Sequence, residues 1–232
     1  MMNLINPSWS TPQDHAQLAS REIHVWGSSI DRDQACTSRF AKLLSRSDRE
    51  RASRFRFSLD GQRFIASRAI LRLILSRYLD VDPRKLEFSY GPHGKPALRT
   101  EDGDLRFSLS HSDGLLLCAV TRDVELGLDV ERIRQPIDAD PIAERMFSPA
   151  VSARIQSLSG SAKVEAFYSS WVLHEAFVKA TGAGLATAPC EFHNFLPDTE
   201  HDGYQFIFEG DYVSALVALA ETTSLTHFWW IE

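Results

Sequence analysis

The sequence has no apolar run that approaches the roughly 20 residues of a membrane-spanning helix, so we expect neither a membrane protein nor a membrane partner. Its start, MMNLINPSWSTPQDH, has no basic residue ahead of an apolar segment and therefore does not resemble a secretory signal. Hydrophobic residues make up 44% and charged residues 24% of the chain, which argues against a disordered or fibrous protein. We expect a cytoplasmic globular protein.

Cysteine is scarce, and positive charge is not in excess. Cys36, Cys118 and Cys190 lie far apart and form no CxxC pair, a pattern that favours reduced thiols used for packing over a disulfide framework or a zinc site. The net charge of −6 gives no overall basic surface, so nucleic acid is not an expected partner.

Residues 39–77 are a local exception to this acidic balance. A basic segment of this kind suits an anionic ligand or an acidic partner, although a solvated surface is the commoner explanation of a run of charges. The segment holds Arg39, Lys42, Arg46, Arg49, Arg51, Arg54, Arg56, Arg63, Arg68, Arg72 and Arg77 against Asp48, Glu50 and Asp60.

The order of predicted elements repeats loosely along the chain. Periodicity predicts a strand, a long helix and strands in the first half, then a strand, a long helix ending at Gly182 and strands in the second. This predicts an α+β protein of two similar lobes, residues 1–122 and 123–232, each a long helix packed on a small, mostly antiparallel sheet and related by a pseudo-twofold axis. The predicted strands are 22–26, 86–90, 105–109, 115–121, 124–131, 206–208, 213–220 and 226–231, the helices are 31–44, 59–79, 140–147 and the one ending at 182, and 157–163 is a linker.

The second long helix carries a carboxylate and an amine within an apolar sequence, WVLHEAFVKATGAGL, from Trp171 to Leu185. Glu175 falls in the middle of one apolar side, and Lys179 follows it one turn later. A buried carboxylate must be paired, hydrogen-bonded or bound to a metal, because its desolvation alone costs several kcal/mol. Glu175 therefore needs a partner elsewhere in the chain, unless the two residues form an ordinary ion pair at a partly hydrated edge.

A second pair of carboxylates lies on the strand GLDVE at 127–131. Side chains at i and i+2 of a strand share one face, so Asp129 and Glu131 project together while Leu128 and Val130 enter the core. Two adjacent carboxylates repel each other unless a cation lies between them, and Mg²⁺ prefers such oxygen ligands. Two solvated acids on an edge strand remain the alternative.

Four blocks of sequence resemble the 4′-phosphopantetheinyl transferases, specifically the longer, two-lobed Sfp-like branch. They are GKP at 94–96, FSLSHS at 107–112, GLDVE at 127–131 and WxxxEAFxKxxGxGL at 171–185, in the order and spacing of that family. The resemblance covers most of the chain, from about Trp26 to the final strands.

The resemblance implies transfer of 4′-phosphopantetheine from coenzyme A to a serine of an acyl or peptidyl carrier protein, with release of adenosine 3′,5′-bisphosphate. Either Glu175 or a metal-bound water would then accept the serine proton. The family pattern gives Asp129, Glu131 and Glu175 to Mg²⁺, Lys179 to the pyrophosphate, and Arg51, Arg63, Lys95, Ser110 and His111 to the nucleotide end. The strand pattern of residues 105–121 predicts that Ser110 and His111 lie at a turn.

Two positions depart from the family pattern. His174 stands where Lys is usual, and we expect it to face the pyrophosphate as a weaker, pH-dependent cation. Asp48 stands where a basic residue often precedes Arg51, which would weaken the grip on the 3′-phosphate. These departures support one alternative, a catalytically impaired coenzyme A-binding partner of a synthase; a Mg²⁺-dependent nucleotide hydrolase is another. Two lobes in one chain predict a site completed at the lobe interface and a monomer. The pathway served, whether fatty acid, polyketide, nonribosomal peptide or siderophore synthesis, is left open.

Overall fold

The computed structural model describes residues 3–5, 7–11, 16–99, 104–183, 202–208 and 211–230. The helices in this part of the chain are α1 (Gln34–Ala41), α2 (Arg46–Ala52), α3 (Ser58–Leu79), the 3₁₀ turn η1 (Pro83–Lys85), α4 (Ala139–Met146), α5 (Pro149–Gln156) and α6 (Gly160–Thr181). The strands are β1 (Asn3–Ile5), β2 (Glu22–Ser29), β3 (Phe88–Tyr90), β4 (Pro96–Leu98), β5 (Leu105–Ser112), β6 (Leu115–Arg122), β7 (Leu126–Arg132), β8 (Asp202–Phe208), β9 (Tyr212–Ala218) and β10 (Ser224–Trp229).

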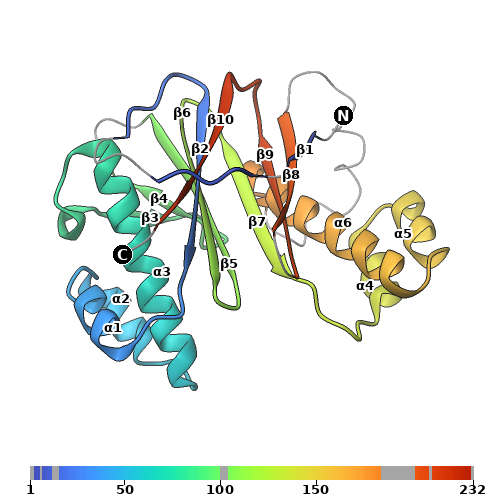
Figure 1. Cartoon of the computed structure of the whole chain (residues 1–232), viewed down its shortest axis with the longest axis horizontal. Coiled ribbons are helices and arrows are strands. Elements are labelled where there is room, and N and C mark those ends of the chain that lie inside the picture. Colours follow the sequence, from blue (N-terminus) through green and yellow to red (C-terminus); the bar gives the residue numbers. More distant parts are fainter. Residues whose placement is uncertain are drawn as a thin grey trace.

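The predicted two-lobed α+β architecture is confirmed. Two four-stranded sheets, in the orders β10-β2-β6-β5 and β1-β8-β9-β7, lie between the long helices α3 and α6, which occupy the two outer sides of the molecule (Figure 1). None of the described helices is both long enough and apolar enough to cross a membrane.

Each sheet is covered on both faces, which explains the long apolar runs in the strands. Alternate side chains of a strand point to opposite faces, so a strand buried on both sides is apolar throughout. Strand β6 is an example, with its even-numbered residues packed in the α3 core and its odd-numbered ones in a core between the two sheets. The even set is Leu116, Cys118 and Val120, and the odd set is Leu115, Leu117 and Ala119.

The two ends of the chain exchange places between the lobes. Strand β1 pairs in parallel with β8 of the second lobe, and β10 pairs in parallel with β2 of the first. Figure 1 accordingly shows β1 on the α6 side of the molecule and β10 beside β2. Trp9 packs edge-on against Trp229 and His227, which fastens the leading segment to β10. The sequence pattern did not predict these parallel pairings, because they join segments from opposite ends of the chain.

The edge strands of the two sheets, β5 and β7, meet along a row of three serine side chains, which we name the serine row (Ser108, Ser110 and Ser112). Their hydroxyl oxygens accept hydrogen bonds from the backbone N–H groups of Leu128, Val130 and Arg132, at 2.9, 3.4 and 3.1 Å. An unpaired N–H at a buried strand edge is costly, so the hydroxyls satisfy an edge that no further strand covers. The serines are spaced two residues apart on β5, and the N–H groups that they bind are spaced two residues apart on β7. The three hydrogen bonds therefore form together in one register.

Several predicted boundaries need correction. Strand β5 runs through Ser112 and its turn is Asp113-Gly114, so Ser110 and His111 lie within the strand and not at the turn. Helix α6 begins at Gly160 inside the expected linker, and α5 was missed. A two-residue loop is enough to connect two antiparallel strands, so β5 and β6 pair up to Ser112 and Leu115 and only Asp113-Gly114 forms the turn. The expected end of α6 at Gly182, which has φ of 70°, is correct.

Asp48 has a structural role that its charge alone did not predict. Its carboxylate accepts a hydrogen bond from Ser45 at 3.0 Å and pairs with Arg72 at 3.4 Å, and both Asp48 and Arg72 are buried. Arg72 also donates to the carbonyl oxygens of Pro83 and Leu86. A buried charge needs such partners. Asp48 therefore anchors α2 to α3, which accounts for an acid within the basic segment.

Gly127 sets the distance between α6 and β7. A Cβ atom at this position would overlap the carbonyl oxygen of Ala176 and the backbone nitrogen of Ala180. Both obstacles are backbone atoms, so neither can rotate away, and the helix would have to move off the strand.

We therefore predict that Gly127→Ala lowers the free energy of unfolding by about 3 kcal/mol, measured by chemical denaturation. The matched control is Gly91→Ala, whose new Cβ would meet only the carbonyl oxygen of Lys95 at 3.7 Å. Equal stability of the two variants would show that α6 can be displaced at no cost.

Candidate active site

A carboxylate and an amine meet at the middle hydroxyl of the serine row, that of Ser110. Asp129 Oδ1 lies 2.6 Å from Lys179 Nζ and accepts a hydrogen bond from Ser110 Oγ at 2.8 Å. Asp129 is 4% exposed. The ion pair joins β7 to α6, and the serine bond joins it to β5. The long helix and both sheets therefore converge on one carboxylate.

Lys179 uses all three of its N–H donors inside the protein. Besides Asp129, its Nζ donates to Ser110 Oγ at 3.1 Å and to the carbonyl oxygen of Leu128 at 3.2 Å. These bonds fix the ammonium group against the seam between the sheets. A contact between Lys179 and an anionic ligand would replace one of them.

Glu131 repeats the arrangement of Asp129 two residues along the strand. It accepts a hydrogen bond from Ser112 Oγ at 2.8 Å, just as Asp129 accepts one from Ser110. The predicted shared face of Asp129 and Glu131 on β7 is confirmed, since Leu128 and Val130 pack in the core between the sheets. Burial raises the pKa of Glu131, and the charge of Asp129 raises it further, against the opposing effect of Ser112.

Glu175 lies in the wall of the larger cavity, of about 670 Å³, together with Lys95 and Lys179. Burial raises the pKa of Glu175, and the negative charges of Asp129 and Glu131 add to this effect, while Lys179 opposes it. Three carboxylates thus share one electrostatic environment, which is unfavourable without additional positive charge. The cavity continues between the loop at residues 91–98 and strand β5.

Lys95 connects the loop of the cavity to the second lobe. Its Nζ donates to the carbonyl oxygen of Leu126 at 3.1 Å and lies 3.5 Å from Glu125. Burial lowers the pKa of Lys95, and Glu125 partly offsets this. The ammonium group therefore holds the loop against the start of β7.

His111 follows Leu109 of the cavity wall on the same face of β5. The ring is exposed at one side, yet the surrounding protein lowers its pKa, and the positive charges of Lys179, Arg68 and Arg63 lower it further. His111 thus belongs to a cluster of cations. Such a cluster repels a proton and attracts an anion.

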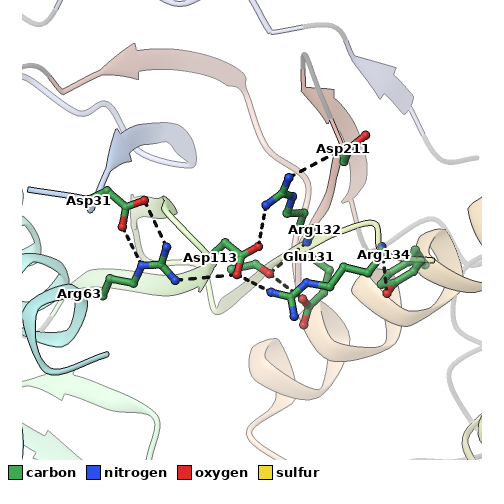
Figure 2. Close-up of polar contacts among 9 residues, drawn as sticks. Asp31, Arg63, Asp113, Glu131, Arg132, Arg134 and Asp211 are labelled. Atoms are coloured by element: carbon green, nitrogen blue, oxygen red, sulfur yellow. Dashed lines mark hydrogen bonds and ion pairs between the residues drawn. The ribbon is translucent and has the colours of Figure 1, made fainter. Parts of the chain in front are cut away.

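Arg63, one member of this cluster, is held by two carboxylates of its own lobe. Its guanidinium donates to both oxygens of Asp31, at 2.7 and 3.2 Å, and lies 3.8 Å from Asp113. Asp113 also pairs with Arg132 at 3.2 Å and with Arg134. Figure 2 shows this network extending from Asp31 to Asp211, across both lobes and beside Glu131.

Arg51 lies over the ring of Phe64, 5.2 Å from its centroid, and Arg68 lies over the same ring at 5.3 Å. Cation–π contacts of this kind position a guanidinium without neutralising its charge. Arg51 is on α2 and Phe64 is on α3, so Arg51 belongs to the α2–α3 side of the site.

His174 does not face the cavity as expected. The side chain is 1% exposed and packs edge-on against Phe147, with ring centroids 6.0 Å apart, in the core beneath α6. The expectation that it acts as a cation toward the pyrophosphate is therefore wrong. The reason is geometric, because residues adjacent in a helix point about 100° apart.

The carboxylates also bear on metal binding. Within the described ranges, no three His, Cys, Asp or Glu side chains are gathered closely enough to hold a metal ion. Asp129 Oδ2, however, is buried and has no hydrogen-bond partner. A buried carboxylate oxygen without a partner is rare and requires an explanation, and a cation is a suitable one.

Comparison with known proteins identifies the family. A family model described as the 4′-phosphopantetheinyl transferase superfamily matches residues 125–224, and one described as 4′-phosphopantetheinyl transferase, N-terminal, matches residues 32–122. The chain is 37% identical to the 4′-phosphopantetheinyl transferase HetI of Nostoc sp. over 185 residues, which cover 79% of this chain and 78% of that protein. The chain belongs to the 4′-phosphopantetheinyl transferase family.

Other members of the transferase family match at lower identity. The putative 4′-phosphopantetheinyl transferase slr0495 of Synechocystis sp. is 32% identical over 82% of this chain and 78% of its own length. The 4′-phosphopantetheinyl transferase Sfp of Bacillus subtilis is 29% identical over 71% and 72%. The N-terminal family match ends with β6, and the second match begins just before β7.

The residues predicted for this transferase gather in part. Ser110, Asp129 and Lys179 are in contact, and Lys95 and Glu175 share the cavity wall with Lys179. Ser108 and Ser112 were missed, although the repeat FSLSHS places all three serines on one face of a strand and could have revealed them.

For this transferase we predict that His174→Lys lowers the free energy of unfolding by about 3 kcal/mol, because it places an ammonium group in an apolar core. Glu165→Lys, which adds a lysine at an exposed position of the same helix, is the control. Thermal unfolding at pH 8 compares the two. Unchanged stability of the His174 variant would show that position 174 reaches solvent.

We also predict that Glu175→Gln raises the melting temperature at pH 8 without divalent cations, on the order of 2 °C. A carboxyl whose pKa is raised on folding opposes folding once it is ionised, so the gain is complete above its folded pKa. The gain vanishes below its ordinary pKa of 4.5, where both states are protonated. Glu165→Gln on the exposed face of α6 is the control, and a lower melting temperature for Glu175→Gln would contradict this account.

Proposed function

We propose that this protein transfers 4′-phosphopantetheine from coenzyme A to a serine hydroxyl of an acyl or peptidyl carrier protein, converting the apo carrier to its holo form. The observation that carries the proposal is the contact between Ser110, Asp129 and Lys179, of which Lys179 lies in the wall of the 670 Å³ cavity. Phosphoryl transfer needs positioning and charge neutralisation more than covalent participation by the protein, and this group supplies fixed charges.

The proposed coenzyme A site extends along the cavity. Its pyrophosphate lies at Lys179, and its nucleotide lies along the loop that holds Lys95. The nucleotide end then approaches the cations near His111, with Arg63 and Arg51 nearby. Support comes from the excess of positive charge on this side of the cavity, because coenzyme A carries several negative charges there.

Mg²⁺ fits the opposite side of the same site. Asp129, Glu131 and Glu175 would hold it, and the unpartnered Oδ2 atom of Asp129 and the raised pKa values of the two glutamates support this choice. Carboxylate oxygens are the ligands that Mg²⁺ prefers. When bound, the ion neutralises charge on the pyrophosphate.

The residues of the chain then perform the remaining tasks. The carrier serine oxygen forms a bond to the β-phosphorus, and the bond from that phosphorus to the bridging oxygen breaks, releasing adenosine 3′,5′-bisphosphate. Either Glu175 or a water at the metal would accept the serine proton, and the raised pKa of Glu175 suits that carboxylate to the role. Lys179 stays over the pyrophosphate because Asp129 holds its ammonium group.

The carrier protein is proposed to approach at the side of Glu131. A second cavity of about 320 Å³ opens there, lined by apolar side chains that include Ile142 and Trp171 as well as by Arg134. The nucleotide fills the larger cavity, so the smaller one leaves a route to the β-phosphorus. All proposed groups come from one chain, and we propose that the protein acts as a monomer in the cytoplasm without nucleic acid or membrane partners.

The alternative, a catalytically impaired coenzyme A-binding partner of a synthase, has lost its support. It rested on His174 and Asp48, and both residues are buried and serve the packing of their own lobes. Neither departure touches the proposed catalytic group.

The test is the intact mass of an apo carrier protein incubated with this protein, coenzyme A and Mg²⁺. We expect the carrier to gain the mass of one phosphopantetheine, and Asp129→Asn to lower the rate by about 100-fold or more, because one fixed negative charge of the site is removed. Arg84→Gln, an exposed change in η1, is the control. Coenzyme A binding with no mass gain on any carrier would contradict the proposed function.

A further inference from the structure

Helix α3 carries four arginines, of which Arg77 lies over the rings of Trp26 and Trp230. The other three differ in how their charges are balanced. Arg63 is paired with Asp31, and Arg72 with Asp48 and two backbone carbonyls. Arg68 forms no hydrogen bond or ion pair with any residue in the described part of the chain, and its NH1 atom is buried without a partner. A guanidinium in this position calls for an anion, because buried donors are almost always satisfied.

The Arg68 side chain is held in place without being neutralised. Its guanidinium carbon lies 5.3 Å from the ring centroid of Phe64 and 5.8 Å from that of Tyr90. Arg51 approaches the Phe64 ring as well, at 5.2 Å. Two aromatic rings therefore hold the guanidinium group of Arg68 in place, as a preorganised binding group requires.

Arg68 is connected to the larger cavity through the residues around it. Tyr90 is the neighbour of Gly91, and His111 stands two residues beyond Leu109, and both Gly91 and Leu109 line that cavity. The charge of Arg68 reaches His111, where it helps to lower the pKa of the imidazole. The other cations around His111 have counter-charges, since Lys179 pairs with Asp129 and Arg63 with Asp31. Of these three cations, Arg68 is the one that pairs with no carboxylate in the described part of the chain.

We infer that Arg68 binds the 3′-phosphate of coenzyme A through its guanidinium fork and makes this transferase selective for coenzyme A over its 3′-dephospho form. The inference rests on the proposed function, since it assigns one phosphate of the proposed substrate. A phosphate monoester offers the oxygens that a guanidinium fork matches, whereas the pyrophosphate is assigned to Lys179 at the other side of the cavity.

The experiment measures dissociation constants of coenzyme A and of 3′-dephospho-coenzyme A by calorimetry, in Mg²⁺ and without a carrier protein. Arg68→Gln is expected to weaken coenzyme A binding by about 10- to 100-fold and to leave 3′-dephospho-coenzyme A within about twofold. Arg68→Lys keeps the charge without the fork, so an intermediate loss is expected. Arg84→Gln removes an exposed positive charge from the same lobe and should change neither constant.

Each other result overturns the assignment. Equal weakening of both ligands would show that Arg68 acts on the shared part of the molecule or on the fold, and no weakening would show that it does not touch the ligand. If Arg68→Gln does not fold, Arg68→Lys and Tyr90→Leu test the assignment instead. Tyr90→Leu is expected to weaken the binding of coenzyme A by less than Arg68→Gln and to leave the binding of 3′-dephospho-coenzyme A unchanged. If the dissociation constants follow the expectation but no carrier protein is modified, the proposed function is refuted and the assignment of Arg68 to the 3′-phosphate stands. If the wild-type protein binds neither coenzyme A nor 3′-dephospho-coenzyme A, both the function and the assignment are refuted.

Discussion

Three serine hydroxyls between β5 and β7 are the contact on which the site depends. Each accepts a hydrogen bond from a backbone N–H of β7, and two of them donate to Asp129 and Glu131. The bonds that close the seam between the lobes are thus the bonds that orient the carboxylates. A shift of one lobe against the other would move the carboxylates and break the seam together, because hydrogen bonds tolerate little displacement.

The seam gathers charges that a structure selected for stability alone would separate. The charge of Asp129 adds to burial in raising the pKa of both Glu131 and Glu175, and Lys179 opposes this only in part. On the other side of the cavity, His111 is surrounded by cations. Opposite charges on the two sides suit a substrate that carries anionic groups and binds together with a metal ion. The crowding of like charges lowers the stability of the fold, as is common in active sites.

The sequence predicts the local features well because they depend on neighbouring residues. The bounds of α3 and the C-terminal end of α6 follow from periodicity and from Gly182, and the shared face of Asp129 and Glu131 follows from the two-residue repeat. Contacts between segments that are distant in the sequence have no local signal, so the parallel pairings of β1 with β8 and of β10 with β2 could not be predicted. The burial of His174 and Asp48 was also out of reach, since a polar residue in a core is explained only by the partners that surround it.

The exchange of strands between the lobes fixes the order in which the protein can be completed during synthesis. Strand β2 lies near the beginning of the chain, yet its parallel neighbour β10 ends at Trp229. The first sheet therefore keeps one edge open until the residues up to Trp229 have left the ribosome. An open strand edge is a site of mispairing. The first lobe of the nascent chain consequently depends on rapid arrival of the second, and the two lobes are one unit for the purposes of folding and cellular quality control.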